Sequence, residues 1–383
     1  MKFFKEVFNK NNKAAIIVAN IIIAAAIVLI CSLVLHNENV KREKLLEEAK
    51  HYSDVVEDQA KDENDKKGNY SFYQKLKKGY DVDILVIGDS IGKGVGTKEE
   101  SAKWFNILKK DLEKRYSVKV EITNISMPGT TSYAGYVNTM LLDYEKVESK
   151  KSYRQYDLAI ICYGQNDADY GFSTNYESII RAVMKKYPNA SIISILESSI
   201  EDKSTKIDVI RELCEYYDLQ IADTVKAFEK EENLSGDGVH PNEAGQLVYS
   251  DTISKIIESN VVANTGKPKN KTALNKKAER YNNFKWYGLD NKKVRQTGSK
   301  SYSADISSSG VLGIYASYLN TDNINIYIDG ELLNLRNQNL NSNLAHDNIA
   351  IIEPNCLINR DIRIDFKSNE EADSFKGFCI SQN

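Results

Sequence analysis

The chain has 383 residues, of which 42% are hydrophobic, 20 are glycine and 5 are proline. This composition excludes a collagen-like or wholly disordered protein, and the length predicts two or three globular units. The 51 Lys and Arg residues are balanced by 54 Asp and Glu residues, giving a net charge of −3, so nucleic acid is not an expected partner. Five cysteines without a CxxC pair exclude a zinc ribbon and a dense disulfide framework.

An uncharged apolar segment, residues 14–35, follows a short basic N-terminus. As a helix, its twenty-two residues would extend for about 33 Å, which matches the hydrocarbon thickness of a bilayer. A cleaved signal peptide would need an apolar stretch of about 7–15 residues and a small-x-small cleavage site, and neither is evident. A lipoprotein site at Cys31 is disfavoured because the preceding Ile30 is bulky. We therefore predict an uncleaved transmembrane helix over residues 14–35.

The positive charges on the two sides of this helix are equal in number. Residues 1–13 carry four lysines, and residues 36–50 carry four lysines or arginines. The second segment also carries four glutamates, which dilute its positive charge. We expect a cytoplasmic tail over residues 1–13, a charged stalk over residues 36–79, and an extracytoplasmic catalytic body at the cell membrane.

Short apolar runs alternate with helix-like segments between residues 80 and 260. This alternation predicts a parallel β-sheet with helices on both faces, an α/β domain. The predicted strands are 82–88, 118–126, 157–164, 190–198 and 219–223. The predicted helices are 100–115, 176–187, 204–217 and 241–259, the last beginning at Pro241.

The composition changes after residue 260. Residues 261–271 contain the Gly, Pro and Lys typical of a linker, and residues 272–383 are rich in Ser, Asn and Tyr with alternating apolar positions. Asp329-Gly330 between apolar flanks predicts a β-hairpin. The C-terminal segment is therefore expected to form a small antiparallel β-sandwich.

Ser90 is the first candidate for chemistry. It follows the first predicted strand within Gly88-Asp89-Ser90, and open α/β sheets place their sites beyond the carboxyl ends of the strands. The alternative is that Ser90 only caps the following helix.

A nucleophilic serine requires a base, and His240 is the histidine within the α/β segment. It occurs in Asp237-Gly238-Val239-His240, where residues three apart in a helical turn face the same side. Asp237 would then accept the Nδ1–H of His240 and leave Nε2 free for Ser90. An ordinary turn is the alternative for this tetrapeptide.

Acyl transfer also requires donors for the oxyanion. Gly129, after the second strand, offers a backbone N–H, and Asn166, after the third strand, offers a side-chain amide. With the N–H of Ser90, they would make three donors.

These four segments, in this order, resemble the SGNH (GDSL) hydrolase family. GDSIGKG fits its nucleophile block, Gly129 its glycine block, GQND its GxND block and DGVH its DxxH block. The resemblance covers residues 80–260 and implies a flavodoxin-like three-layer α/β/α fold. The GxSxG elbow of α/β-hydrolases also fits GDSIG, but there the acid and histidine are far apart in sequence. The resemblance implies the nucleophile Ser90, the triad partners Asp237 and His240, and the oxyanion donors Ser90, Gly129 and Asn166.

The resulting hypothesis is a membrane-tethered serine esterase or O-acyltransferase. Its expected substrate is a short acyl ester, such as an acetyl group, on a cell-surface polysaccharide. The alternative is a noncatalytic glycan-binding accessory protein that serves a membrane acyltransferase. No metal-ligand spacing is evident, so neither a metal nor another cofactor is expected.

Other conspicuous residues have simpler interpretations. Cys162 and Cys214 are predicted to be core residues, whereas pairing of Cys356 with Cys379 is left open. The tyrosines beside the site loops are candidates to line an acyl or sugar pocket. They are Tyr133, Tyr163 and Tyr170.

Overall fold

The computed structural model describes residues 70–148, 153–267, 271–317, 323–334 and 348–382. The predicted transmembrane helix at 14–35, the cytoplasmic tail and nearly all of the predicted stalk lie outside these residues. Within the described ranges, no helix is long and apolar enough to cross a membrane.

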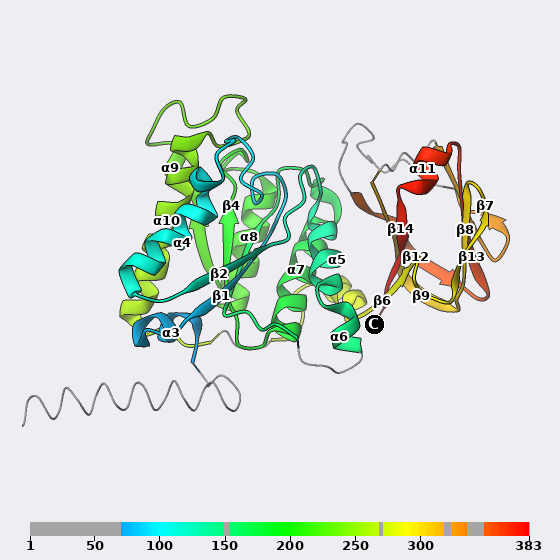
Figure 1. Cartoon of the computed structure of the whole chain (residues 1–383), viewed down its shortest axis with the longest axis horizontal. Coiled ribbons are helices and arrows are strands. Elements are labelled where there is room, and N and C mark those ends of the chain that lie inside the picture. The colour runs from blue at the N-terminus through cyan, green and yellow to red at the C-terminus, as the bar shows by residue number, and fades with distance from the viewer. Residues whose placement is uncertain (1–69, 149–152, 268–270, 318–322, 335–347, 383) are drawn as a thin grey trace, which may run out of the picture. The chain divides into compact units, whose positions relative to one another are not determined.

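A parallel sheet of five strands forms the centre of the N-terminal half (Figure 1). The strand order is β2-β1-β3-β4-β5, and every neighbouring pair is parallel. This confirms the predicted α/β class, because each apolar run contains one strand. The strands are β1 (Val82–Gly88), β2 (Val120–Asn124), β3 (Leu158–Cys162), β4 (Ser191–Leu196) and β5 (Gln220–Asp223).

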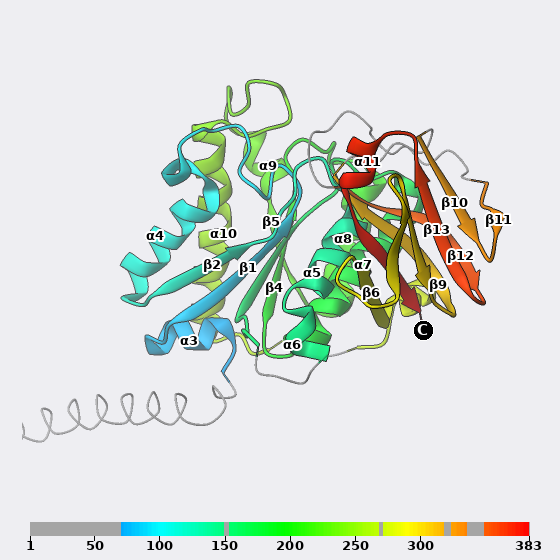
Figure 2. The ribbon, with the colours of Figure 1, turned by 45° about the vertical axis from the view of Figure 1, so that its right-hand side comes forward.

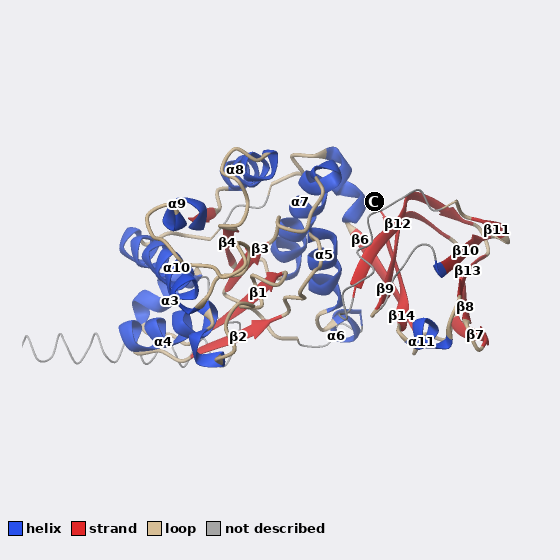
Figure 3. Ribbon diagram, turned by 90° about the horizontal axis from the view of Figure 1, so that it is seen from above, coloured by secondary structure: helices blue, strands red, loops and turns tan. Residues whose placement is uncertain are grey.

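Helices cover both faces of this sheet, as Figure 3 shows from above. Leu85 and Ile87 of β1 join a core with α5, α7 and α8, whereas Ile84 and Val86 join a second core with α3, α4 and α10. Strands buried on both faces explain why the apolar runs are continuous rather than alternating. The helices of the first face are α5 (Ser132–Leu141), α7 (Asp169–Lys186) and α8 (Thr205–Tyr217); those of the second are α3 (Phe72–Lys78), α4 (Trp104–Tyr116) and α10 (Glu243–Ala263). Shorter helices are η1 (Glu100–Ala102), α6 (Tyr144–Glu148) and α9 (Thr224–Phe228).

Two expectations about helices were wrong. The range 36–79 was expected to be stalk, but its residues 72–78 form α3, whose Phe72 and Leu76 are buried in the core. The last helix was expected to begin at Pro241, but α10 begins at Glu243 because the Asn242 side chain caps it, accepting a hydrogen bond from the backbone N–H of Gly245 at 3.1 Å.

The C-terminal segment forms two antiparallel sheets, as expected for a β-sandwich (Figure 2). Their orders are β11-β10-β13-β8-β7 and β12-β9-β14-β6, and a common apolar core is drawn from both. The predicted hairpin is confirmed: Asp329 and Gly330 have φ of 53° and 91° and join β10 to β11. The strands are β6 (Asn283–Gly288), β7 (Val294–Gly298), β8 (Ser301–Asp305), β9 (Ser308–Ala316), β10 (Ile324–Ile328), β11 (Glu331–Leu332), β12 (Asn348–Ile358), β13 (Asp361–Phe366) and β14 (Phe375–Gln382). The helices of this segment are η2 (Lys276–Tyr281) and α11 (Asn369–Asp373).

Tyrosines of α5 contact the C-terminal segment directly. The Tyr136 hydroxyl donates to the carbonyl oxygen of Tyr281 at 3.0 Å, and the Tyr133 hydroxyl lies 3.4 Å from Cys379 Sγ. Cys379 and Cys356 are free thiols, so the pairing left open by the sequence is not formed. Tyr133 is therefore a packing residue rather than part of a pocket for substrate.

Candidate active site

The turn after β1 presents Ser90. A Cβ on Gly88 would lie 2.8 Å from the carbonyl oxygen of Cys162, and one on Gly92 would lie 2.8 Å from the Cα of Gly88. Only glycine allows the chain to fold back so closely at both positions. Ser90 is consequently held at the carboxyl end of β1, where the residue is only 7% exposed.

The structure brings Ser90, His240 and Asp237 into one hydrogen-bonded row. His240 Nε2 lies 3.0 Å from Ser90 Oγ, and His240 Nδ1 lies 2.6 Å from Asp237 Oδ2. The predicted spacing of three residues thus places the acid against one ring nitrogen and the serine against the other. This is the geometry of a serine activated by a general base.

Asp237 is fixed by its own turn. Its Oδ1 accepts the backbone N–H of Val239 at 2.9 Å and that of His240 at 2.7 Å. The hydrogen bonds from the His240 side chain and from these two amides hold the pKa of Asp237 well below its usual range. The carboxylate therefore remains ionised and can orient the Nδ1–H of His240, although its side chain is 58% exposed.

Gly96 is a position of close packing beside the site that the sequence analysis missed. It has φ of 111°, and a Cβ there would lie 2.2 Å from the carbonyl oxygen of Pro241. The loop that follows Ser90 can therefore lie directly on the backbone beside His240. A glycine six residues after a candidate nucleophile was the available signal, but its partner is 145 residues away in the chain.

The two predicted oxyanion loops lie beside the Ser90 turn. Asn166 Nδ2 donates to Asp89 Oδ2 at 3.0 Å and to the carbonyl oxygen of Thr130 at 3.1 Å. Gly129, which precedes Thr130, has φ of 73°, a conformation that favours glycine. The amide of Asn166 thus links the glycine loop to the residue next to Ser90.

Three buried carboxyl groups lie beneath this linkage, and the sequence analysis assigned no role to them. Asp89 and Glu197 are fully buried, and burial together with the charge of Glu197 raises the pKa of Asp89 well above its usual range. Asp167 accepts from the backbone N–H and the hydroxyl of Ser132, at 3.0 and 2.6 Å. Burial raises the pKa of Asp167 to about 6. Asp167 and Glu197 each follow a strand, which was the signal in the sequence.

The remaining candidate tyrosines separate into buried and exposed positions. Tyr163 is fully buried, with its hydroxyl 3.3 Å from that of Thr130. Tyr170 is 92% exposed and lies at a kink near the start of α7, where Gly171 has φ of 85°. Tyr170 follows Asn166 by only four residues, so an exposed aromatic ring lies close in sequence to the oxyanion loop.

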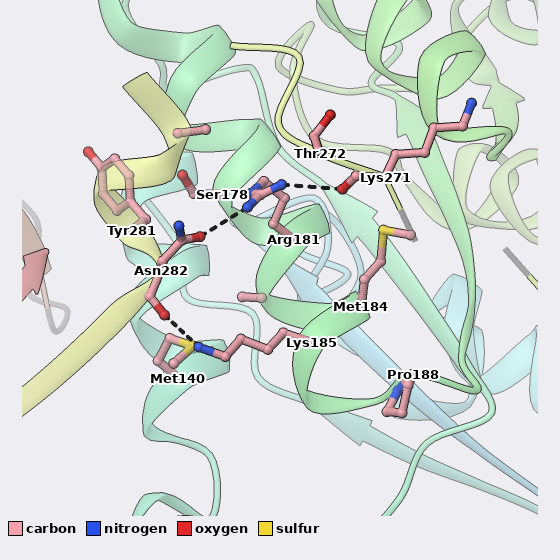
Figure 4. A pocket seen from close by; sticks show the side chains of 12 residues that line it. Met140, Ser178, Arg181, Met184, Lys185, Pro188, Lys271, Thr272, Tyr281 and Asn282 are labelled. Carbon is pink, nitrogen blue, oxygen red and sulfur yellow. Dashed lines mark hydrogen bonds between the residues drawn. The ribbon is translucent and has the colours of Figure 1, made fainter. Parts of the chain in front are cut away.

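A cavity lies away from these residues (Figure 4). It has a volume of about 590 Å³ and lies beside α7, where Arg181 Nη2 donates to Asn282 Oδ1 at 3.0 Å. None of the predicted site residues lines it. In the described part of the chain, no group of three His, Cys, Asp or Glu residues is placed to hold a metal ion.

Comparisons with known proteins agree with this geometry. Residues 86–248 match the GDSL-like lipase/acylhydrolase family. A two-domain esterase (CEX) active on acetylated mannans, solved with mannopentaose, matches with a TM-score of 0.60, 16% identity, and coverage of 81% of this chain and 93% of that chain. A second crystal structure of a two-domain esterase (CEX) active on acetylated mannans matches with a TM-score of 0.61 and the same identity and coverage. A search of curated proteins finds no match. Since the likeness covers 81% of the chain, the shared fold extends beyond the α/β half.

Proposed function

Residues 86–248 belong to the GDSL-like lipase/acylhydrolase family, and from this premise of a serine esterase we propose that the protein cleaves or transfers short acyl groups, acetyl above all, on glycans. The observation that carries the proposal is the row of contacts from Ser90 through His240 to Asp237. We also propose that Ser90, Gly129 and Asn166 supply the oxyanion donors.

The proposed reaction begins with proton transfer from Ser90 Oγ to His240 Nε2. Asp237 holds the Nδ1–H and stabilises the imidazolium that results. Ser90 Oγ bonds to the acyl carbon, and the carbonyl oxygen becomes an oxyanion that accepts hydrogen bonds from the three donors. The C–O bond to the sugar then breaks, and His240 returns the proton to the leaving sugar oxygen. Water or another hydroxyl group attacks the acyl-enzyme by the reverse sequence and regenerates Ser90.

A glycan substrate is supported by two features. The esterase with the similar fold acts on acetylated mannans, and the structural match to this chain covers 93% of that esterase. In this chain, the acid–histidine end of the triad is open to solvent, since the His240 side chain is 27% exposed and that of Asp237 is 58% exposed. An open site suits an ester carried on a polymer, which cannot enter a deep enclosed pocket.

The choice between hydrolysis and transfer depends on the acyl acceptor. The test is to incubate the purified full chain with acetylated mannan, with and without a deacetylated oligosaccharide acceptor, and to measure where the acetyl group appears. Free acetate in both reactions indicates an esterase, and acetylated acceptor indicates a transferase. If no acetyl group leaves the polymer or an activated acetyl ester under either condition, the proposed function is wrong.

Tyr170 is proposed to contact the sugar that carries the ester. Replacing it by alanine should raise KM for acetylated mannan about fivefold, the equivalent of roughly 1 kcal/mol of lost aromatic contact, with kcat unchanged. KM for a small acetyl ester should not change, because such an ester has no sugar to contact. Val262→Ala is the control, since Val262 is 76% exposed but lies at the distant end of α10. Equal changes in KM for both substrates would contradict the role of Tyr170.

We further propose that the catalytic body is extracytoplasmic and held at the cell membrane by residues 14–35. The twenty-two uncharged residues of this segment support the proposal. Protease added to intact cells should then digest the body and leave an epitope tag at the N-terminus intact, as measured by immunoblotting. If the body is digested only after the cells are opened, it lies on the cytoplasmic side and the proposed orientation is wrong.

A further inference from the structure

Gln246 is a buried polar residue that the proposed reaction does not use. It lies near the start of α10, which packs beside α4 on one face of the sheet (Figure 2), and it is fully buried. A side-chain amide that is shielded from water needs protein partners for its oxygen and for both of its N–H hydrogens. The positions of these partners show which parts of the chain Gln246 holds together.

The amide of Gln246 joins three segments of the chain. Its Oε1 accepts the backbone N–H of Trp104 at 2.9 Å. Its Nε2 donates to the carbonyl oxygen of Val95 at 3.2 Å and to that of Pro241 at 3.0 Å. These partners fix the orientation of the amide, because the backbone N–H requires an acceptor and the two carbonyl oxygens require donors.

Two of these segments lead directly to the nucleophile. The backbone N–H of Val95 donates to the carbonyl oxygen of Ser90 at 2.9 Å. The indole Nε1 of Trp104 donates to the carbonyl oxygen of Ile91, the residue after Ser90, at 3.1 Å. Gln246 therefore holds the turn that carries Ser90 at two points, through Val95 and through Trp104.

The third segment carries the general base, since Pro241 directly follows His240. Gly96 lets the loop after Ser90 lie against this segment, because a Cβ there would be 2.2 Å from the carbonyl oxygen of Pro241. This same oxygen accepts the hydrogen bond from Gln246 Nε2. One amide group thus connects the backbone of the serine loop to the backbone of the histidine turn.

We propose that Gln246 is a positioning residue that sets the distance between Ser90 Oγ and His240 Nε2. That distance is 3.0 Å, within the reach of about 2.6–3.2 Å that direct proton transfer requires. The contact between Asp237 and His240 does not depend on Gln246, because these two residues share one turn. The inference rests on the proposed function, because it takes His240 as the base that activates Ser90.

Two substitutions at this position remove the connection while keeping the length of the side chain. Glutamate retains an acceptor for the N–H of Trp104 but places an oxygen, instead of two N–H donors, against the carbonyl oxygens of Val95 and Pro241. Methionine carries no charge and offers none of the three hydrogen bonds. Both variants leave every residue of the proposed triad and oxyanion hole unchanged.

Gln246→Glu and Gln246→Met should each lower kcat for a small activated acetyl ester about tenfold or more, because a displacement of about 1 Å between reacting groups can cost 100-fold. KM should change less than twofold, since the buried Gln246 side chain contacts no substrate. The rate at which a fluorophosphonate labels Ser90 should fall by a similar factor. That rate depends on activation of the serine but on no sugar. All measurements use the purified full chain.

Asn260→Asp is the matched control. Asn260 also lies on α10, fourteen residues or about 21 Å further along the helix. Its Nδ2 donates to Gln220 Oε1 at 3.1 Å and to the carbonyl oxygen of Ile256 at 2.8 Å, and its Oδ1 accepts from the Thr265 hydroxyl at 2.7 Å. The same exchange of an amide for an acid should leave kcat and the labelling rate unchanged. A loss confined to Gln246→Glu is then not a general effect of an acid in α10.

Double variants distinguish positioning of the base from a general loss of structure. In the His240→Ala background, Gln246→Glu should lower kcat by less than about twofold further, because the base that it positions is absent. In the Asn166→Ala background, the two losses should multiply, because the proposed oxyanion donor acts independently of the distance between Ser90 and His240.

Three results would overturn the proposal. The first is a wild-type kcat and labelling rate in the folded Gln246 variants. The second is a loss as large in the His240→Ala background as in the wild type, or no further loss in the Asn166→Ala background. The third is failure of both Gln246 variants to fold, as measured by circular dichroism and thermal unfolding, because Gln246 would then be required for the fold itself. Failure of the proposed function would look different, since Ser90→Ala would then retain the wild-type activity.

Discussion

Replacing Ser90 by alanine should lower kcat for an acetyl ester by at least about 10⁴-fold, because the variant lacks the oxygen that forms the acyl-enzyme. The hydroxyl lies 3.0 Å from His240 Nε2, close enough for direct proton transfer. The same residue should react with a serine-directed fluorophosphonate, and mass spectrometry should locate the label on the peptide that contains residue 90.

The control for this prediction is Ser259→Ala. Ser259 lies on α10, where its hydroxyl donates to the carbonyl oxygen of Lys255 at 2.9 Å, within its own helix. This variant should keep the wild-type kcat and the wild-type labelling. Labelling of another serine in the folded wild-type protein, or substantial turnover by Ser90→Ala, would show that Ser90 is not the nucleophile.

The Asn166→Ala substitution should lower kcat by about 10²–10³-fold with little change in KM, as the loss of one preorganised oxyanion donor does in other enzymes. Its two hydrogen bonds, to Asp89 and to the carbonyl oxygen of Thr130, lie at the edge of the site. Their loss should reduce the free energy of unfolding by only about 1 kcal/mol each. Steady-state kinetics and thermal unfolding of the same preparation separate the two effects.

Asn189→Ala is the control for the asparagine variant. Asn189 precedes β4, at the opposite edge of the sheet from Ser90, and its side chain accepts from Lys267 Nζ at 2.6 Å. It should leave kcat unchanged. A folded Asn166→Ala protein with wild-type kcat would remove Asn166 from the oxyanion hole and leave Gly129 and the Ser90 amide as its donors.

Much of the α/β half could be predicted because its signals are local. Strands β1, β3 and β4 lie in largely apolar runs because both faces of the sheet are covered, and the loops that carry Ser90, Gly129 and Asn166 each follow a strand. Asp237 and His240 are three residues apart, so a single turn brings their side chains together. Parallel strands place their carboxyl ends at one edge of the sheet, and this topology explains why loops distant in sequence were expected at one site.

The boundaries that were wrong depended on polar capping and on packing. Pro241 is suited to a first helical turn, but the Asn242 side chain satisfies the free N–H of Gly245 and starts α10 at Glu243. Residues 72–78 resemble the charged stalk in composition, yet the apolar side of α3 is buried against the sheet. Neither the start of α10 nor the burial of α3 follows from composition. The first depends on a side-chain hydrogen bond, and the second depends on packing against the sheet.

The carboxyl pair required the folded chain. Asp89 and Glu197 are 108 residues apart, and nothing in either local segment relates them. They meet because β3 lies between β1 and β4 in the sheet, so that loops from three strands converge around Cys162 and Asn166. The burial that raises the pKa of both acids arises from the same packing. Local sequence thus predicts which residues can do chemistry, whereas strand order and burial determine which of them lie together in the core.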